Sequence, residues 1–229
     1  MRSLKISLIL ICLLAFFLGS FFLFRKKNQK EFESAITYPA PNQEIQAEKL
    51  VKLETKDDFN KLESKYCINY GKENAPIKIV EFFTFQCPHC IRLFRTEFEN
   101  LKKDFIDTGK VSFTFHPVPQ DLPTAQALLC LEQLDAKQKQ LFLEVILEEV
   151  DPSDPELTAR LMMTAMNIFK KPIPNLEDPE FLSQHPVFEK IFLFIKQRKI
   201  LAVPSVEVNG HLFANEIPDY LFIKSVTKD

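Results

Sequence analysis

Two cysteines separated by only two residues stand where a predicted strand ends and a predicted helix begins. Residues 77–85 are almost all β-branched or aromatic, which is typical of a strand buried on both faces. In the helix that follows, Cys87 takes the N-cap position, Pro88 the first helical position and Cys90 the third. Because the first N–H groups of a helix lack partners and its dipole is positive there, this position favours the ionised form of Cys87.

The Cys-x-x-Cys arrangement predicts redox chemistry. The thiolate is the nucleophile, so we expect Cys87 to form and break mixed disulfides. Cys90 lies one turn further into the helix, where an apolar stripe begins, and should be the shielded, resolving partner. His89 can give the Cys87 thiolate a hydrogen bond or a positive charge, which would lower its pKa further and make the disulfide a strong oxidant. The stripe comprises Phe94, Phe98, Leu101 and Phe105.

Two other interpretations of the cysteine pair are weaker. A structural disulfide across two residues closes a very small loop and restricts the unfolded chain little. A zinc site needs two further ligands, and the sequence has no second Cys-x-x-Cys and no closely spaced histidine pair. We therefore expect no metal.

The neighbouring patterns predict an α/β fold. An amphipathic pattern over residues 93–110 ends near Gly109, and residues 111–115 alternate as a strand does. A right-handed crossover would make this strand parallel to the one before Cys87.

The C-terminal half is first helical and then forms a hairpin. Apolar residues recur with helical spacing over residues 124–199, with breaks at prolines, which predicts about three or four helices. Predicted strands at 205–208 and 211–214 flank Asn209–Gly210, a strong two-residue turn signal, and a short helix follows at about 218–226.

Three separated motifs resemble the DsbA-like thiol:disulfide oxidoreductases over about residues 66–226. The resemblance implies an α/β thioredoxin fold, residues 66–229, with an all-helical subdomain inserted at about residues 120–200. It also implies a protein disulfide oxidoreductase that introduces disulfides into exported proteins, and we expect no cofactor. The motifs are Asn74–Val80, Glu81–Cys90 with its Cys-Pro-His-Cys sequence, and Val203–Gly210.

Pro204 opens a predicted core strand, where proline is unusual. From the residues alone, a trans proline at a strand start is the commoner state. In the family that this chain resembles, the matching proline is cis and packs beside the Cys-x-x-Cys pair. The resemblance further implies that the backbone of Val203 binds substrate peptide as an added strand.

Glu81 belongs to the same predicted strand, six residues before Cys87. A buried carboxylate without a partner is costly, so its presence there requires a reason. Its position matches the buried acid of the family, which the resemblance implies relays a proton during thiol exchange. The alternative is a glutamate at the strand edge that reaches solvent.

Cys67 and Cys130 lie outside the motif. Free cysteines are unusual in an oxidising compartment. Either the two form a second disulfide or both are buried small apolar side chains, and sequence does not show whether their Cα atoms come within bonding range.

The N-terminus predicts export. Residues 6–24 are apolar for nineteen residues, enough to cross a bilayer, and follow a short basic start. We expect residues 1–24 to be a signal peptide or, since the apolar run continues past a poor cleavage site, a retained membrane anchor. Residues 25–65 are predicted to be a linker and lead-in helix. The catalytic domain would then lie in the periplasm or cell envelope, anchored in the inner membrane.

The distribution of charge bears on which partners the protein can bind. The first thirty residues hold six of the 29 Lys and Arg residues and none of the 31 Asp and Glu residues, so the remainder is net acidic and nucleic acid is not an expected partner. We expect unfolded or reduced exported proteins as substrates. The resemblance implies a quinone-linked membrane oxidase that restores the disulfide.

Two alternatives to the oxidase remain open. A disulfide isomerase or reductase would need a site that is kept reduced and, in isomerases, an N-terminal dimerisation domain, for which residues 25–65 are short. From another class, the chain could be a peptide-binding chaperone whose helical part and Val203–Pro204 edge hold unfolded exported proteins.

Overall fold

The computed structural model describes residues 65–176 and 178–227, and the fold is that of these residues. The predicted signal or anchor segment at residues 1–24, and the predicted linker up to residue 64, lie outside the described residues. Among the described helices, none is both long and apolar enough to cross a bilayer.

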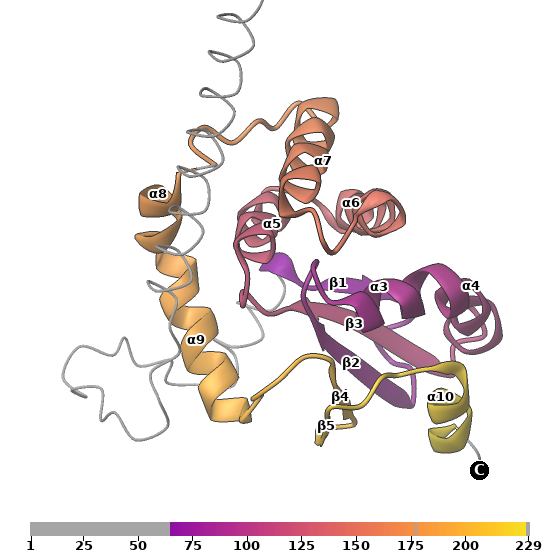
Figure 1. Cartoon of the computed structure of the whole chain (residues 1–229). Coiled ribbons are helices and arrows are strands. Elements are labelled where there is room, and N and C mark those ends of the chain that lie inside the picture. The colour runs from indigo at the N-terminus through magenta and orange to yellow at the C-terminus, as the bar shows by residue number, and fades with distance from the viewer. Residues whose placement is uncertain (1–64, 177, 228–229) are drawn as a thin grey trace, which may run out of the picture. The chain divides into compact units, whose positions relative to one another are not determined.

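The described residues form a mixed sheet with the strand order β1-β3-β2-β4-β5 (Figure 1). β2 and β3 are parallel, as predicted, and the other neighbouring pairs are antiparallel. The predicted hairpin is confirmed, with positive φ at both Asn209 (48°) and Gly210 (87°). β1 was not predicted, because three residues are too few to show alternation. The strands are β1 (Ile68–Tyr70), β2 (Ile77–Phe83), β3 (Val111–Pro117), β4 (Ser205–Val208) and β5 (His211–Ala214).

The helix that carries the cysteines runs from Pro88 to Ile106 and contains two π-helical turns, which periodicity did not predict. Its predicted apolar stripe is buried. Its parts are α3 (Pro88–Leu93), η2 (Phe94–Phe98), α4 (Glu99–Leu101) and η3 (Lys102–Ile106).

Between β3 and β4 the described residues form five helices, where the sequence predicted about three or four. The additional one is the short α8, between two proline breaks. All but α9 begin after an aspartate whose carboxylate accepts a hydrogen bond from the first turn. The helices are α5 (Leu122–Glu132), α6 (Ala136–Glu149), α7 (Pro155–Ile168), α8 (Pro179–Ser183) and α9 (Pro186–Arg198), and α10 (Tyr220–Val226) follows β5.

The helical insertion is tied to the sheet and to the cysteine-bearing helix. α6 packs against β1 and η2, while α7 packs against α5 and α6 (Figure 1). Arg95 in η2 donates hydrogen bonds to the carbonyl oxygens of Leu147 (2.7 Å) and Val150 (2.6 Å) at the end of α6. Carbonyls at a helix end otherwise lack partners, so these bonds fix α6 relative to the helix that begins at Cys87.

His116 is fully buried between the sheet and α9. Its ring stacks on Phe194 of α9, with centroids 4.8 Å apart and 7° between the planes, and also meets Phe82 of β2. Nδ1 lies 3.2 Å from the carbonyl oxygen of Pro117, and Nε2 has no hydrogen-bond partner among the described residues. Burial lowers the pKa of His116 from 6.5 to about 3, so the ring packs as a neutral group.

We predict that His116 makes the fold sensitive to acid. Its folded pKa is depressed, so its contribution to stability is complete above pH 6.5 and is lost as the pH falls from 6.5 through about 3, because the unfolded chain takes up the proton. By pH 5 the loss is about 2 kcal/mol. His116→Phe keeps an aromatic ring and removes this titration. Urea unfolding should therefore show a smaller decrease in free energy between pH 7 and pH 5 than in the wild type.

The matched control is His211→Phe, since His211 is exposed on β5. This variant should keep the wild-type dependence on pH. An equal decrease in the His116 variant and the wild type would contradict the prediction.

Candidate active site

Cys87 caps the helix as predicted. It has extended backbone angles (φ −78°, ψ 109°), its Sγ accepts a hydrogen bond from the backbone N–H of Cys90 at 3.3 Å, and Pro88 begins the helix. Both cysteine residues are buried, with Cys87 7% and Cys90 1% exposed, whereas Pro88 and His89 are exposed. Access to the pair is therefore through the Cys87 side.

The two thiols differ in acidity. A hydrogen bond from the Cys90 thiol, together with the backbone N–H groups of Cys90 and His89, lowers the pKa of Cys87 from 9.0 to about 7, against the opposing effect of burial. The same thiol bond, burial and the Glu81 carboxylate raise the pKa of Cys90 far above its ordinary value. Cys87 is thus the sulfur that ionises, and Cys90 remains a thiol.

His89 acts on Cys87 through its main chain. Its backbone N–H is one of the groups that stabilise the Cys87 thiolate, and its imidazole is exposed. A bond or charge from the imidazole, as expected from the sequence, is not among the contacts of the described residues, and its role stays a prediction.

Glu81 lies in β2 between Phe115 of β3 and Val206 of β4, and it is fully buried. The alternative of a glutamate that reaches solvent is therefore wrong. Burial raises the pKa of Glu81 from 4.5 to about 8; the neighbouring Cys90 thiol counteracts this, and the negative charge of Cys87 adds to it. Neither carboxyl oxygen of Glu81 has a hydrogen-bond partner among the described residues. A carboxylic acid that keeps its proton at neutral pH thus lies beside both cysteines.

Val203–Pro204 is a cis peptide bond, as predicted. Ser205 pairs with Phe82, so the two preceding residues continue alongside the end of β2, where the chain turns toward Cys87. The buried Ser205 hydroxyl donates to the carbonyl oxygen of Ala202 at 2.8 Å and fixes this loop. Leu201, at the start of the loop, is 87% exposed.

Residues of α5 hold the loop before Cys87, and sequence reasoning missed them. The backbone N–H of Phe85 donates to the hydroxyl of the buried Thr124 at 2.9 Å. The Thr124 N–H in turn donates to the carboxylate of Asp121, the N-cap of α5, at 2.7 Å. An available signal was Asp121 two residues before Pro123, an N-cap followed by a first-turn proline.

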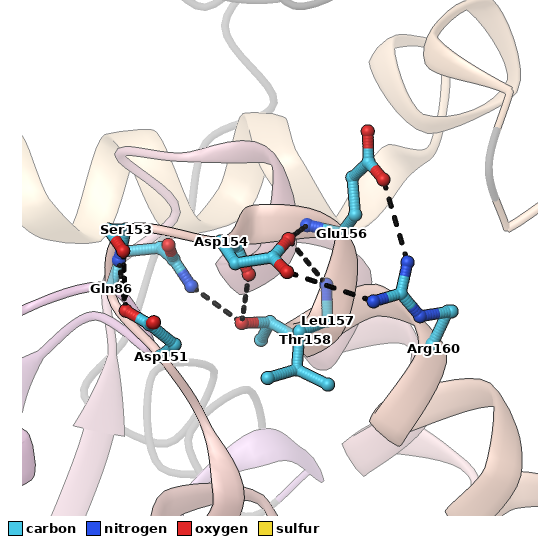
Figure 2. Close-up of polar contacts among 8 residues, drawn as sticks. All are labelled: Gln86, Asp151, Ser153, Asp154, Glu156, Leu157, Thr158 and Arg160. Carbon is cyan, nitrogen blue, oxygen red and sulfur yellow. Dashed lines mark hydrogen bonds and ion pairs between the residues drawn. The ribbon is translucent and has the colours of Figure 1, made fainter.

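A second contact joins this loop to α7. Gln86, next to Cys87, donates from Nε2 to the hydroxyl of the fully buried Thr158 at 2.8 Å (Figure 2). Thr158 lies one turn after Asp154, which caps α7 through the N–H groups of Glu156 and Leu157 (Figure 2). The first turns of two insertion helices therefore meet the segment that presents Cys87.

Cys87 and Cys90 are not joined in this structure, so the active-site pair is in its reduced form, and Cys67 and Cys130 are also buried. Burial raises the pKa of Cys130 to about 12, which makes it a poor nucleophile. A disulfide between Cys67 and Cys130 stays a prediction. Within the described residues, no group of three or more His, Cys, Asp or Glu side chains could hold a metal ion.

The chain is similar in sequence to known proteins. A family model named Thioredoxin matches residues 63–222. The disulfide bond formation protein D of Bacillus subtilis is 30% identical over 165 residues, which cover 67% of this chain and 72% of that protein. A Bacillus anthracis protein named "Probable disulfide bond formation protein D" is 32% identical over 166 residues, covering 67% and 73%.

The chain is also similar in structure to solved proteins. Oxidised BdbD from Bacillus subtilis superimposes with a TM-score of 0.58 at 27% identity, covering 72% of this chain and 92% of that one. DsbA from Chlamydia trachomatis gives 0.52 at 26% identity, covering 71% and 90%.

We predict that Cys87 is the cysteine that iodoacetamide labels in reduced protein at mildly acidic pH. At about pH 6.5, a pKa near 7 gives roughly twentyfold more thiolate than an ordinary cysteine. The rate against pH should have its midpoint near 7. Cys90→Ala removes the thiol donor and should raise this midpoint, while Cys90→Ser keeps a donor and should raise it less. Equal labelling of Cys87 and Cys90 would contradict the assignment.

We also predict that Glu81 destabilises the reduced protein at alkaline pH. Its folded pKa is raised, so its contribution to stability is complete below pH 4.5 and is lost as the pH rises through about 8. Glu81→Gln removes this titration and should gain at least about 2 kcal/mol on the wild type between pH 5 and pH 8. Chemical unfolding at both pH values measures it, with the exposed Glu99→Gln as control. If the difference in free energy of unfolding between Glu81→Gln and the wild type were the same at pH 5 and pH 8, a buried, protonated Glu81 would be contradicted.

Proposed function

The chain belongs to the thioredoxin family and is a DsbA-like protein-disulfide oxidoreductase, and on that premise we propose that it introduces disulfides into exported proteins. This direction is supported by the relatives named disulfide bond formation protein D and by the difference between the two thiols. The pKa of Cys87 is lowered to about 7 while that of Cys90 is raised. A stabilised thiolate favours the reduced enzyme, and its disulfide is then an oxidant.

The proposed reaction is dithiol–disulfide exchange. A substrate thiolate attacks Cys87 Sγ of the Cys87–Cys90 disulfide, forms a mixed disulfide and releases Cys90 as a thiolate. A second substrate thiolate then attacks the substrate sulfur of the mixed disulfide and releases Cys87 as a thiolate. The substrate loses two electrons and the enzyme gains them, so no cofactor takes part in this step.

Glu81 is the proposed proton donor to Cys90. Because its pKa is raised to about 8, Glu81 holds a proton at neutral pH beside the sulfur that leaves as a thiolate. When the enzyme is reoxidised, Cys90 must lose that proton again, and the resulting carboxylate is the acceptor. His89 and Pro88 shape the exposed approach to Cys87.

Val203 and Pro204 are the proposed edge for substrate peptide. The loop follows the end of β2 toward Cys87, and an extended peptide there would add main-chain hydrogen bonds at the Val203 backbone. The exposed Leu201 adds apolar surface beside it. Main-chain bonding with few side-chain requirements suits an enzyme that accepts many unfolded proteins.

The catalytic domain is proposed to act outside the cytoplasm, in the periplasm or cell envelope, where disulfides persist. The apolar residues 6–24 would export it and anchor it in the inner membrane. A quinone-linked membrane oxidase is the proposed partner that restores the Cys87–Cys90 disulfide.

We predict a reduction potential more oxidising than about −200 mV when the protein is equilibrated with glutathione. Cys90→Ser is first treated with oxidised glutathione, so that Cys87 carries a mixed disulfide with glutathione. A reduced exported protein should then displace the glutathione thiol and accumulate as a mixed disulfide with Cys87, because the Cys90 thiol that could release it is absent. Cys87→Ser should form none.

A potential near that of thioredoxin, about −270 mV, would favour a reductase instead. Full protection of unfolded protein from aggregation by Cys87→Ser, together with no disulfide formation in substrates by the wild type, would favour the chaperone.

A further inference from the structure

The start of α5 is joined to the loop of Cys87 by a short chain of hydrogen bonds. The carboxylate of Asp121 accepts from the N–H of Thr124 at 2.7 Å and also binds the hydroxyl of Thr84. The carbonyl oxygen of Thr84 accepts from the N–H of Cys87 at 3.1 Å. Thr124 adds a further hydrogen bond between α5 and this loop, because its hydroxyl accepts from the N–H of Phe85. Asp121 is thus one residue away from direct contact with the backbone of Cys87.

This carboxylate also acts on the Cys87 sulfur electrostatically. Asp121 is half-buried, and burial raises the pKa of its carboxyl group. Its negative charge raises the pKa of Cys87, against the hydrogen bonds that lower it. The other acid of the site, Glu81, acts chiefly on Cys90. The two acids come from different elements: Glu81 lies in β2 near both cysteines, and Asp121 acts on Cys87 from the start of α5.

We propose that Asp121 is a positioning residue that holds the Thr84–Cys87 loop on α5 and, through its charge, limits the stabilisation of the Cys87 thiolate. The proposal rests on the proposed oxidase function. A thiolate that is too stable leaves readily but attacks poorly, since nucleophilicity falls with basicity. Cys87 must leave when substrate is released and must attack when the enzyme is reoxidised. A nearby carboxylate keeps both steps accessible.

Capping and charge can be separated by substitution. Asn is as good an N-cap as Asp, so Asp121→Asn keeps an oxygen for the N–H of Thr124 and for the hydroxyl of Thr84 while it removes the charge. Asp121→Ala removes both. The matched control is Asp135→Asn, which neutralises the N-cap of α6. The Asp135 carboxylate accepts a hydrogen bond from the N–H of Gln138 in the first turn of its own helix.

The test is made on the full-length protein. Asp121→Asn should move the midpoint of Cys87 alkylation to lower pH and shift the equilibrium with glutathione roughly twofold to fivefold toward reduced enzyme. Its rate of reoxidation by a small disulfide should fall. Asp135→Asn should leave all three values as in the wild type. Asp121→Ala should show the same shift in midpoint as Asp121→Asn and a lower melting temperature in both redox states.

An unchanged alkylation midpoint in Asp121→Asn, or the same shift in Asp135→Asn, would overturn the proposal. The proposal would also be overturned if Asp121→Asn raised the pH midpoint of Cys87 alkylation and lowered the melting temperature, because Asp121 would then act only as a helix cap. Each of these outcomes is measured as a difference between a variant and the wild type. Failure of the proposed function would instead appear as a wild-type potential in the reductase range, so the two failures are distinguishable.

Discussion

The hydrogen bond between Cys87 Sγ and the N–H of Cys90 is the interaction on which the site depends. It exists because β2 ends at Phe83 and a helix begins five residues later at Pro88, so unpaired N–H groups must be satisfied at that place. A sulfur that caps a helix is favoured as a thiolate. The same geometry turns Cys90 inward, toward Glu81, where its hydrogen bond to Cys87 and its burial keep it protonated. The junction between β2 and the helix thereby gives two residues of the same type, Cys87 and Cys90, different acidities.

The helical insertion contributes to the chemistry as well as covering the sheet. Its first helix offers Asp121 and Thr124 to the loop before Cys87, and α7 offers Thr158 to Gln86. Arg95 joins the end of α6 to the helix that Cys87 caps. A displacement of the insertion would therefore alter the position of the nucleophile. This coupling gives a physical reason for inserting helices between β3 and β4, directly beside the reactive strand end.

Local signals predicted the elements whose formation is local. The cap at Cys87, the first-turn Pro88 and the Asn209–Gly210 turn each satisfy a requirement of neighbouring backbone, and all three are confirmed. β1 and the π-helical turns were missed, because β1 is held by its pairing with β3 and the turns by packing in the core. The start of α5 at Leu122 was predicted two residues late, and its N-cap Asp121 was overlooked for that reason.

The sequence by itself determined which sulfur is the nucleophile, because a helix cap is set by residues adjacent in the chain. It also predicted that Glu81 lies in a strand, since residues 77–85 are almost all β-branched or aromatic. Only the tertiary structure decided that the Glu81 side chain is buried and does not reach solvent. The tertiary structure decided which groups act on the two thiols. Glu81 acts on Cys90, and Asp121 acts on Cys87, across the fold. Charge interactions depend on distance through space, and distance between residues remote in sequence is set only when sheet and insertion pack together.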